Sequence, residues 1–175
     1  MGAESPPRAP LPRGSATAGG APDTLPRPQG GSHRFYENVM GVYFDDLDAF
    51  QILHNARYLL LFERTIGAFW KHMGWGGVLD AQRNPDQFHM VRANTVEYLS
   101  PVRGVCEVRV RVWVERLGTS SLTFGFRVLP IDRDTDHCRG SRTLVRVDPE
   151  SFRPVAWSPS IVAQLGPWRA DLPAP

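Results

Sequence analysis

A single long amphipathic segment limits the folds that this chain can adopt. Residues 56–73 (ARYLLLFERTIGAFWKHM) follow the 3.6-residue period of an α-helix. Its apolar side chains fall within about 120° of the helical wheel, and Arg57, Arg64 and Lys71 share the opposite side. The apolar stripe consists of Tyr58, Leu59, Phe62, Ile66, Phe69, Trp70 and Met73. The segment therefore predicts one helix that needs an extensive apolar cover.

The predicted ends of this helix carry residues that favour helix boundaries. Asn55 is the expected N-cap, and Gly74 is the expected glycine after the last helical residue. Leu60 and Leu61 lie outside the apolar stripe, so we expect both on the surface of a single chain.

Five other segments predict β-strands. They are residues 34–45, 88–99, 104–116, 121–129 and 138–147, and residues 158–166 predict a short helix. The clearest alternation puts Cys106 and four valines on one side of residues 104–116, and places Trp113 among the charged residues on the other. Such alternation indicates an antiparallel sheet with one covered face and one solvated face.

The order strand, helix, four strands predicts an α+β fold. A helix of about 27 Å is covered most simply by a curved, antiparallel, five-stranded sheet wrapped around it. This is the outline of the hotdog fold, although other α+β arrangements satisfy the same order.

The first 32 residues differ from the rest in composition. They contain thirteen proline or glycine residues and no aromatic residue, which predicts a disordered tail. Residues 33–175 suffice for one domain with a single core.

Composition excludes several classes of partner. The net charge is +2 and no run of basic residues is present, so nucleic acid is not an expected partner. No apolar stretch reaches the roughly 18 residues of a membrane helix, and the first residues lack the layout of a secretory signal. Cys106 and Cys138 have neither disulfide-framework nor metal-ligand spacing. We expect a cytoplasmic protein that does not bind membranes.

The sharpest local feature is an acidic turn before the long helix. Asp45, Asp46 and Asp48 lie within four residues, and Asn55 follows Asp48 by seven. Unpaired N–H groups at a helix N-terminus stabilise an oxyanion, and a carboxylate beside them can attack a carbonyl carbon or activate water. Acidic residues are also common in turns and caps, so the spacing alone leaves a purely structural role open.

The acidic turn resembles the motif of the 4-hydroxybenzoyl-CoA-thioesterase-like hotdog hydrolases. In that family, an Asp-x-Asp run is followed by a glycine and an Asn-Asn-x-x-Tyr-Leu segment before the central helix. Matching residues here are Asp46-Leu47-Asp48, Asn55-Ala56-Arg57-Tyr58-Leu59 and Phe62-Glu63. The resemblance continues through Glu97–Pro101, Arg116–Phe124 and Thr143–Asp148, and covers roughly residues 35–166.

The resemblance implies an acyl thioesterase with Asp48 as nucleophile or general base. It implies that the Asn55 backbone N–H polarises the thioester carbonyl. Two positions depart from the family motif, because Gln51 replaces its glycine and His54 replaces its first asparagine. Since glycine serves such turns through its conformational freedom, we expect the turn at Gln51 to run differently.

Further site residues are expected on the same basis. His54 is a candidate general base, although capping is its more common role at such a turn, and Glu63 is a reserve nucleophile or a structural hydrogen-bonding residue. Candidate substrate-binding residues are Tyr58, Arg103, Arg116, Ser120 and Ser121.

The sequence thus predicts hydrolysis of an acyl-CoA or acyl-carrier-protein thioester by a homodimer or homotetramer. No metal or other cofactor is implied. The alternative is a hotdog module that binds acyl thioesters, or a protein partner, without turnover; Gln51 and His54 favour this alternative.

Overall fold

The computed structural model describes residues 35–77, 80 and 83–170, so the predicted tail at residues 1–32 lies outside the described residues. The predicted long helix, five strands and short C-terminal helix are each confirmed, with ends shifted by up to three residues. The elements are β1 (Tyr36–Val42), α1 (Asn55–His72), β2 (His89–Tyr98), β3 (Cys106–Leu117), β4 (Ser121–Pro130), β5 (Cys138–Arg146) and α2 (Pro159–Leu165), with three short 3-10 turns, η1 (Phe44–Asp46), η2 (Pro85–Gln87) and η3 (Gly166–Trp168).

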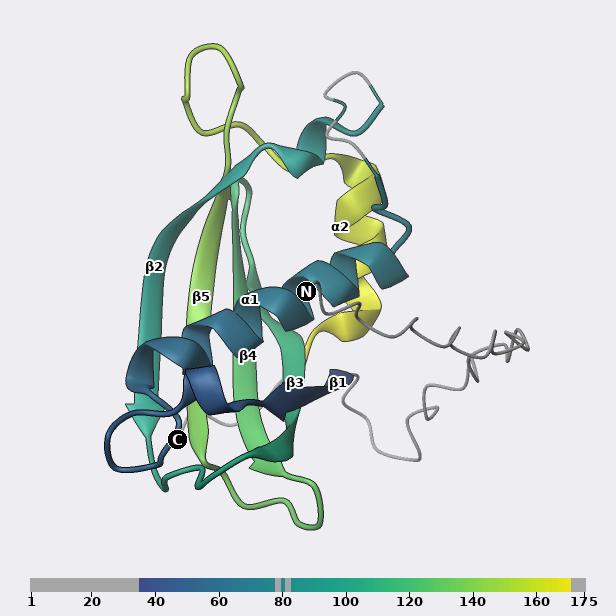
Figure 1. Ribbon diagram of the computed structural model, residues 1–175. Coiled ribbons are helices and arrows are strands. Elements are labelled where there is room, and N and C mark those ends of the chain that lie inside the picture. The colour runs from purple at the N-terminus through teal and green to yellow at the C-terminus, as the bar shows by residue number, and fades with distance from the viewer. Residues whose placement is uncertain (1–34, 78–79, 81–82, 171–175) are drawn as a thin grey trace, which may run out of the picture.

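The strands form one antiparallel sheet in the order β1-β3-β4-β5-β2. The sheet curves around α1, which crosses its concave side (Figure 1). The backbone of α1 lies mainly beside β3 and β1, and β2, at the far edge, is exposed along most of its length. The predicted α+β hotdog architecture is confirmed.

Aromatic and β-branched side chains fill the space between the sheet and α1. The alternate valines of β3, from Val108 to Val114, are buried as their spacing predicts. Phe62 of α1 stacks on Phe126 of β4 with ring centroids 4.2 Å apart. Truncating a fully buried phenylalanine such as Phe62 to alanine removes about 3–5 kcal/mol of stability, so this contact contributes strongly to holding α1 on the sheet.

The prediction that Leu61 lies on the surface is wrong. Leu61 is 2% exposed and belongs to the core. Its neighbour Thr65 is also fully buried and satisfies its hydroxyl by donating to the Leu61 carbonyl at 2.9 Å. A curved sheet covers a wider arc of a helix than the apolar stripe alone indicates, and the buried arc of α1 extends accordingly.

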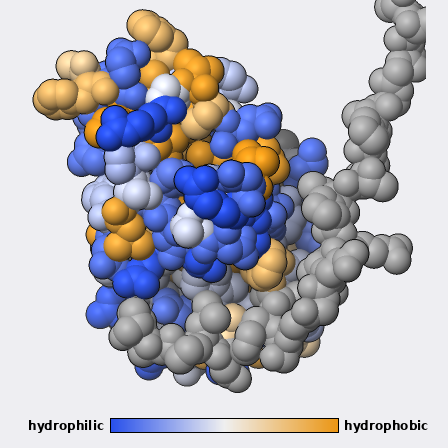
Figure 2. Space-filling view, turned by 90° about the horizontal axis from the view of Figure 1, so that it is seen from below, coloured by the Kyte–Doolittle hydropathy of each residue, from blue (hydrophilic) through white to orange (hydrophobic). Residues whose placement is uncertain are grey.

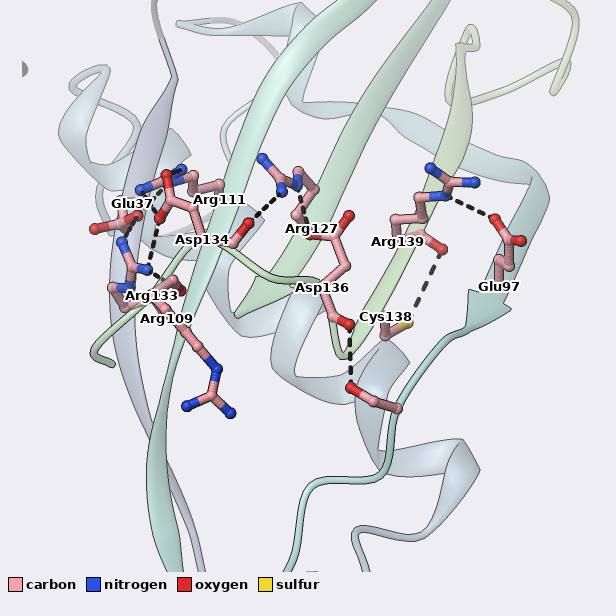
Figure 3. Close-up of polar contacts among 11 residues, drawn as sticks. Glu37, Glu97, Arg109, Arg111, Arg127, Arg133, Asp134, Asp136, Cys138 and Arg139 are labelled. Carbon is pink, nitrogen blue, oxygen red and sulfur yellow. Dashed lines mark hydrogen bonds and ion pairs between the residues drawn. The ribbon is translucent and has the colours of Figure 1, made fainter. Parts of the chain in front are cut away.

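The convex face of the sheet carries paired charges. Arg109 and Arg111 of β3 bind Asp134 at 2.7 and 2.9 Å, and both also pair with Glu37 of β1 (Figure 3). Arg139 of β5 pairs with Glu97 of β2 on the same face. Hydrogen bonds from Arg111 and Arg109 lower the pKa of Asp134 to about 2. The charges on this face are largely matched by neighbours of opposite sign.

Trp113 lies among these charged residues, as predicted. Its ring covers Gly125 of β4, where an added Cβ would lie 2.4 Å from the ring. The neighbouring strand therefore needs a glycine opposite this tryptophan.

Candidate active site

Asp46 fixes the acidic turn between the end of β1 and the start of α1. Asp46 is only 6% exposed, and its carboxylate accepts the Tyr43 backbone N–H at 3.0 Å. It also pairs with Arg57 in the first turn of α1 at 3.5 Å. The Asp46 carbonyl accepts the His54 N–H at 3.0 Å. Asp46 therefore joins the strand end to the helix start and shapes the turn that holds Asp48.

Asp48 is half-buried and has one carboxylate oxygen held by the turn. Its Oδ1 accepts the backbone N–H groups of Phe50 at 2.8 Å and Ile52 at 3.3 Å. The Asp48 backbone closes the turn, because its N–H donates to the Ile52 carbonyl and its carbonyl accepts the Gln51 N–H. No hydrogen bond joins Oδ2 to the described residues. The carboxylate is thus oriented through one oxygen, which leaves the other for chemistry.

Gln51 adopts a left-handed backbone conformation, with φ 57°. A residue with a Cβ costs about 1–2 kcal/mol in this region, whereas glycine enters it freely. Gln51 therefore retains a turn that suits glycine rather than rerouting it, contrary to the expectation from its side chain. The turn is held from outside, since the Gln51 carbonyl accepts the Gly104 N–H at 3.0 Å.

The N-cap of α1 is His54, and the prediction of Asn55 is wrong by one residue. His54 Nδ1 accepts the Ala56 N–H at 3.2 Å, and the His54 carbonyl accepts the Arg57 N–H at 2.8 Å. A backbone N–H can only donate, so the neutral ring carries its proton on Nε2. In this arrangement His54 offers solvent an N–H donor and no free basic nitrogen.

The backbone N–H of Asn55 remains available at the start of α1. It is one of the donors that an α-helix leaves unpaired, and no hydrogen bond within the described ranges uses it. Tyr98 of β2 donates its hydroxyl to the Asn55 carbonyl at 3.0 Å and so fixes the first helical residue against the sheet edge. Sequence reasoning did not select Tyr98, although it lies in the Glu97–Pro101 segment.

Two of the predicted substrate-binding residues lie near this turn. Arg103 is exposed, and its backbone pairs with Ile52 directly after the Asp48 turn. Tyr58 is 3% exposed and its hydroxyl accepts the Val102 N–H at 3.3 Å. Burial raises the pKa of Tyr58. Tyr58 therefore anchors the segment that supports the turn, and only Arg103 presents its side chain to solvent here.

Arg116, Ser120 and Ser121 lie at the other end of the sheet. They belong to the β3–β4 hairpin, whereas the Asp48 turn lies by Cys106, where β3 begins. The twelve residues of β3 span about 35 Å at the usual rise of a strand. These three residues therefore do not join Asp48 in one site within a single chain.

Glu63 lies two turns along α1 and is bound by Arg142 of β5. Arg142 is 6% exposed, donates Nε to Asn94 Oδ1 of β2 at 2.7 Å, and lies over the Phe62 ring. Neither Arg142 nor Asn94 was selected from the sequence. The available signal was that Arg142 has the same strand parity as the inward residues Cys138 and Leu144.

Large hydrophobic side chains are exposed around the Asp48 turn. Phe50 is 82% exposed, and Tyr43, Phe44 and Val105 are also largely exposed. Figure 2 views the molecule from below relative to Figure 1 and shows hydrophobic side chains beside strongly polar ones on that face. The turn therefore offers apolar surface next to its charged groups.

A cavity of about 1100 Å³ lies at the opposite end of α1. Its walls come from the segment after α1 and from α2, and include Trp75, Asp86 and Ser158. It lies beyond the C-terminal end of α1, about 27 Å along the axis from Asn55. No residue predicted to act in catalysis lines it.

In the described part of the chain, all helices are too short or too polar to cross a membrane. Across residues 35–77, 80 and 83–170, no three His, Cys, Asp or Glu side chains are grouped so as to hold a metal ion.

Comparisons with known proteins agree with this architecture. The model of the thioesterase superfamily matches residues 50–135, a range that begins just after Asp48. The acyl-CoA thioester hydrolase YbgC of Escherichia coli O6:H1 is 29% identical over 125 residues, which cover 71% of this chain and 90% of YbgC.

Solved structures share the fold. The PA5185 protein of Pseudomonas aeruginosa superposes with a TM-score of 0.67 at 21% identity, over 79% of this chain and 92% of that one. The SAV2348 protein of Staphylococcus aureus, solved in complex with CoA, gives a TM-score of 0.68 at 14% identity, over 85% and 94%. The family match, the curated relative and the curved sheet around α1 lead to one conclusion: this chain has the hotdog fold and is similar to the thioester hydrolases of the thioesterase superfamily.

Proposed function

We propose that this protein hydrolyses acyl-CoA thioesters at the Asp48 turn, with Asp48 as nucleophile or general base and the Asn55 backbone N–H as oxyanion donor. The observation that carries the proposal is the arrangement of these two groups. Asp48 is held through Oδ1, its Oδ2 has no partner among the described residues, and the N-terminus of α1 begins directly after the same turn.

The chemistry follows from these positions. The thioester oxygen accepts the Asn55 N–H at the positive end of the α1 dipole, which stabilises the negative charge that develops during attack. Asp48 Oδ2 either attacks the carbonyl carbon or removes a proton from an attacking water. The C–S bond then breaks; the thiolate takes a proton from solvent in the first route, and in the second it takes the proton that Asp48 removed from water, which restores the Asp48 carboxylate. In the first route, water hydrolyses the resulting mixed anhydride and restores the carboxylate.

The two other predicted catalytic residues have different places in this proposal. His54 holds the helix start through Nδ1, so we assign it capping of α1 and an Nε2–H donor near the site. Glu63 is the reserve nucleophile, but its carboxylate is engaged by the buried guanidinium of Arg142. Asp48 is therefore the better candidate.

The substrate assignment rests on chemistry that the relatives share. YbgC is an acyl-CoA thioester hydrolase and SAV2348 was solved with CoA, so acyl-CoA is our first choice and an acyl-carrier protein the second. The free cysteines Cys106 and Cys138 are consistent with our placement of the protein in the reducing cytoplasm.

We also infer a homo-oligomer, a dimer or a tetramer. β2 is a ten-residue edge strand that is exposed along most of its length, and it carries the exposed apolar residues Met90 and Val91. Long exposed edges with apolar side chains favour pairing with another chain. Sedimentation velocity is expected to give at least a dimer, and a stable monomer at micromolar concentration would contradict this inference.

A free-thiol assay over acyl-CoAs of several chain lengths tests the proposed activity. We expect thiol release with at least one acyl group. Binding of acyl-CoA without release from any of them would instead support the non-catalytic module, for which the hydrogen bonds of Asp48 Oδ1 would serve only to shape the turn.

A further inference from the structure

A buried arginine lies on the face of the sheet that packs against α1. Inward positions on β5 alternate through Cys138, Gly140, Arg142 and Leu144, and Arg142 is 6% exposed. Its inward neighbours are Gly140 and Leu144, and burial raises the pKa of Cys138, the next inward residue, to about 12. Arg142 thus places a guanidinium in surroundings that are otherwise mostly apolar.

The guanidinium connects α1 to the edge strand. Nη1 pairs with Glu63 of α1, Nε donates to Asn94 Oδ1 of β2, and the group lies 5.0 Å from the Phe62 ring centroid. A guanidinium has five N–H donors. No hydrogen bond joins Nη2 to the described residues, so at least two donors of a nine-tenths buried side chain are free to bind a ligand.

Stability alone gives little reason for this arrangement. Buried ion pairs are often no better for stability than apolar residues of similar volume. The carboxylate partner is also 59% exposed at its side chain, which further weakens the attraction by solvent screening. An inward leucine or methionine would suit the packing, so a binding role accounts better for the arginine.

A strip of residues leads from the proposed oxyanion donor to this arginine. We define the α1–β2 strip by Asn55, Leu59 and Glu63 on α1 and by Tyr98, Val96 and Asn94 on β2. The first three are spaced by one helical turn, and the second three share one face of the strand.

The α1–β2 strip is polar at both ends and apolar between them. Tyr98 binds the Asn55 carbonyl at one end, and Arg142 bridges Glu63 and Asn94 at the other. Leu59 and Val96 between them are half-buried apolar residues packed against the core. This order suits an acyl group with a carbonyl at one end, an alkyl chain, and a polar group at the far end.

The polar end of the strip lies at about the same distance from the proposed carbonyl position whether it is measured along α1 or along β2. Glu63 follows Asn55 by eight residues, which is about 12 Å along a helix. Asn94 and Tyr98 are four residues apart, which is about 13 Å along a strand. An extended chain gains about 3.5 Å in three bonds, so this distance corresponds to about ten bonds from the thioester carbonyl.

We propose that Arg142, Glu63 and Asn94 form a subsite for a hydroxyl group about ten bonds from the thioester carbonyl, so that the enzyme selects hydroxylated medium-chain acyl thioesters. The inference rests on the proposed function, because it takes the Asn55 N–H as the place of the carbonyl. A free Arg142 N–H donates to the hydroxyl oxygen, and the hydroxyl proton is donated to the Glu63 carboxylate.

The charges of the subsite favour binding of a hydroxyl group over binding of a carboxylate. Glu63 offsets the charge of Arg142 and repels a second carboxylate at this position. A hydroxyl both accepts and donates, so it satisfies both groups without adding charge. The wild-type protein is therefore expected to prefer a terminal alcohol over a terminal acid of the same length.

The test compares three CoA thioesters that differ only at the far end: decanoyl, 10-hydroxydecanoyl and the monothioester of decanedioic acid. We expect kcat/KM for 10-hydroxydecanoyl-CoA to exceed that for decanoyl-CoA by about tenfold, as for one hydrogen bond to a charged group. Pentanoyl-CoA and 5-hydroxypentanoyl-CoA serve as a length control and are expected to differ little. Equal kcat/KM values for the decanoyl pair would overturn the proposal.

Two variants assign the preference to the subsite. Arg142→Met is expected to lose the tenfold preference for the hydroxyl, whereas Arg139→Met, which removes an arginine of the same strand from the opposite face, is expected to keep it. Glu63→Gln is expected to shift the preference toward the decanedioic thioester. Loss of all hydrolysis in Glu63→Gln would instead identify Glu63 as the nucleophile and contradict its place in the subsite.

Failure of the proposed function gives a different result. If no thioester is hydrolysed, calorimetric titration with the same three compounds still measures the preference as a ratio of Kd values, and the unfolding temperature of Arg142→Met shows whether the variant is folded. A tenfold ratio in Kd would then support the subsite, and equal Kd values would refute it.

Discussion

Replacement of Gln51 by glycine tests how the turn that holds Asp48 is maintained. Gln51 has φ 57° and an exposed side chain, so its left-handed backbone is the main feature that a substitution changes. Relief of the strain favours glycine by about 1–2 kcal/mol, and the greater freedom of glycine in the unfolded chain offsets about 0.4–1 kcal/mol of this. We therefore expect Gln51→Gly to raise the free energy of unfolding by about 0.5–1 kcal/mol.

Two further substitutions at position 51 isolate the backbone effect. Gln51→Ala retains the Cβ and is expected to change stability by less than about 0.5 kcal/mol. Gln51→Val adds a branched Cβ, which fits the left-handed region worst, and is expected to be the least stable. Urea unfolding at pH 7 measures all three. A glycine variant no more stable than the alanine variant, or a well-tolerated valine, would refute the strain argument.

Three other predictions follow from individual contacts. Burial among tryptophans lowers the pKa of His89 from 6.5, so the folded protein binds fewer protons at this residue than the unfolded chain does. The free energy of unfolding is therefore expected to fall as the pH drops below 6.5. His89→Phe should lessen this fall, as measured by urea unfolding at pH 5 and pH 7. The pKa of Asp134 lies at about 2 instead of 3.8, so its contribution is present above pH 3.8 and is lost between pH 3.8 and 2. Because Asp134 is exposed, Asp134→Asn should lower stability by less than about 1 kcal/mol at pH 7 and flatten this acid transition. Tyr98→Phe removes the bond to the Asn55 carbonyl and should lower the free energy of unfolding by about 1 kcal/mol; an unchanged value would show that this bond adds nothing.

The sequence determined the fold well because its signals are periodic. The apolar stripe of residues 56–73 and the alternation in β3 depend only on which residues face the core, and both match the structure. Leu61 was misplaced because the pattern of one helix does not reveal how far the sheet curves around it.

The candidate site was only partly predictable for a related reason. The Asp48 turn and the helix start lie close in sequence, so spacing alone brought them together. The inward Arg142 depends on partners 79 and 48 residues away, and no local pattern relates those positions. The placement of Arg116, Ser120 and Ser121 at the far end of β3 likewise follows from strand length and topology rather than from any motif.

Replacing the Asp48 carboxylate is the most direct test of the account. Asp48→Asn preserves an oxygen that can accept the N–H groups of Phe50 and Ile52, so the turn is expected to remain folded while the charge is lost. Asp45→Asn is a matched control, because Asp45 is exposed in the same turn. With the best acyl-CoA substrate, the account predicts that Asp48→Asn lowers kcat by about 100-fold or more and that Asp45→Asn leaves it within twofold. An Asp48→Asn protein that retains the wild-type kcat would contradict the assignment.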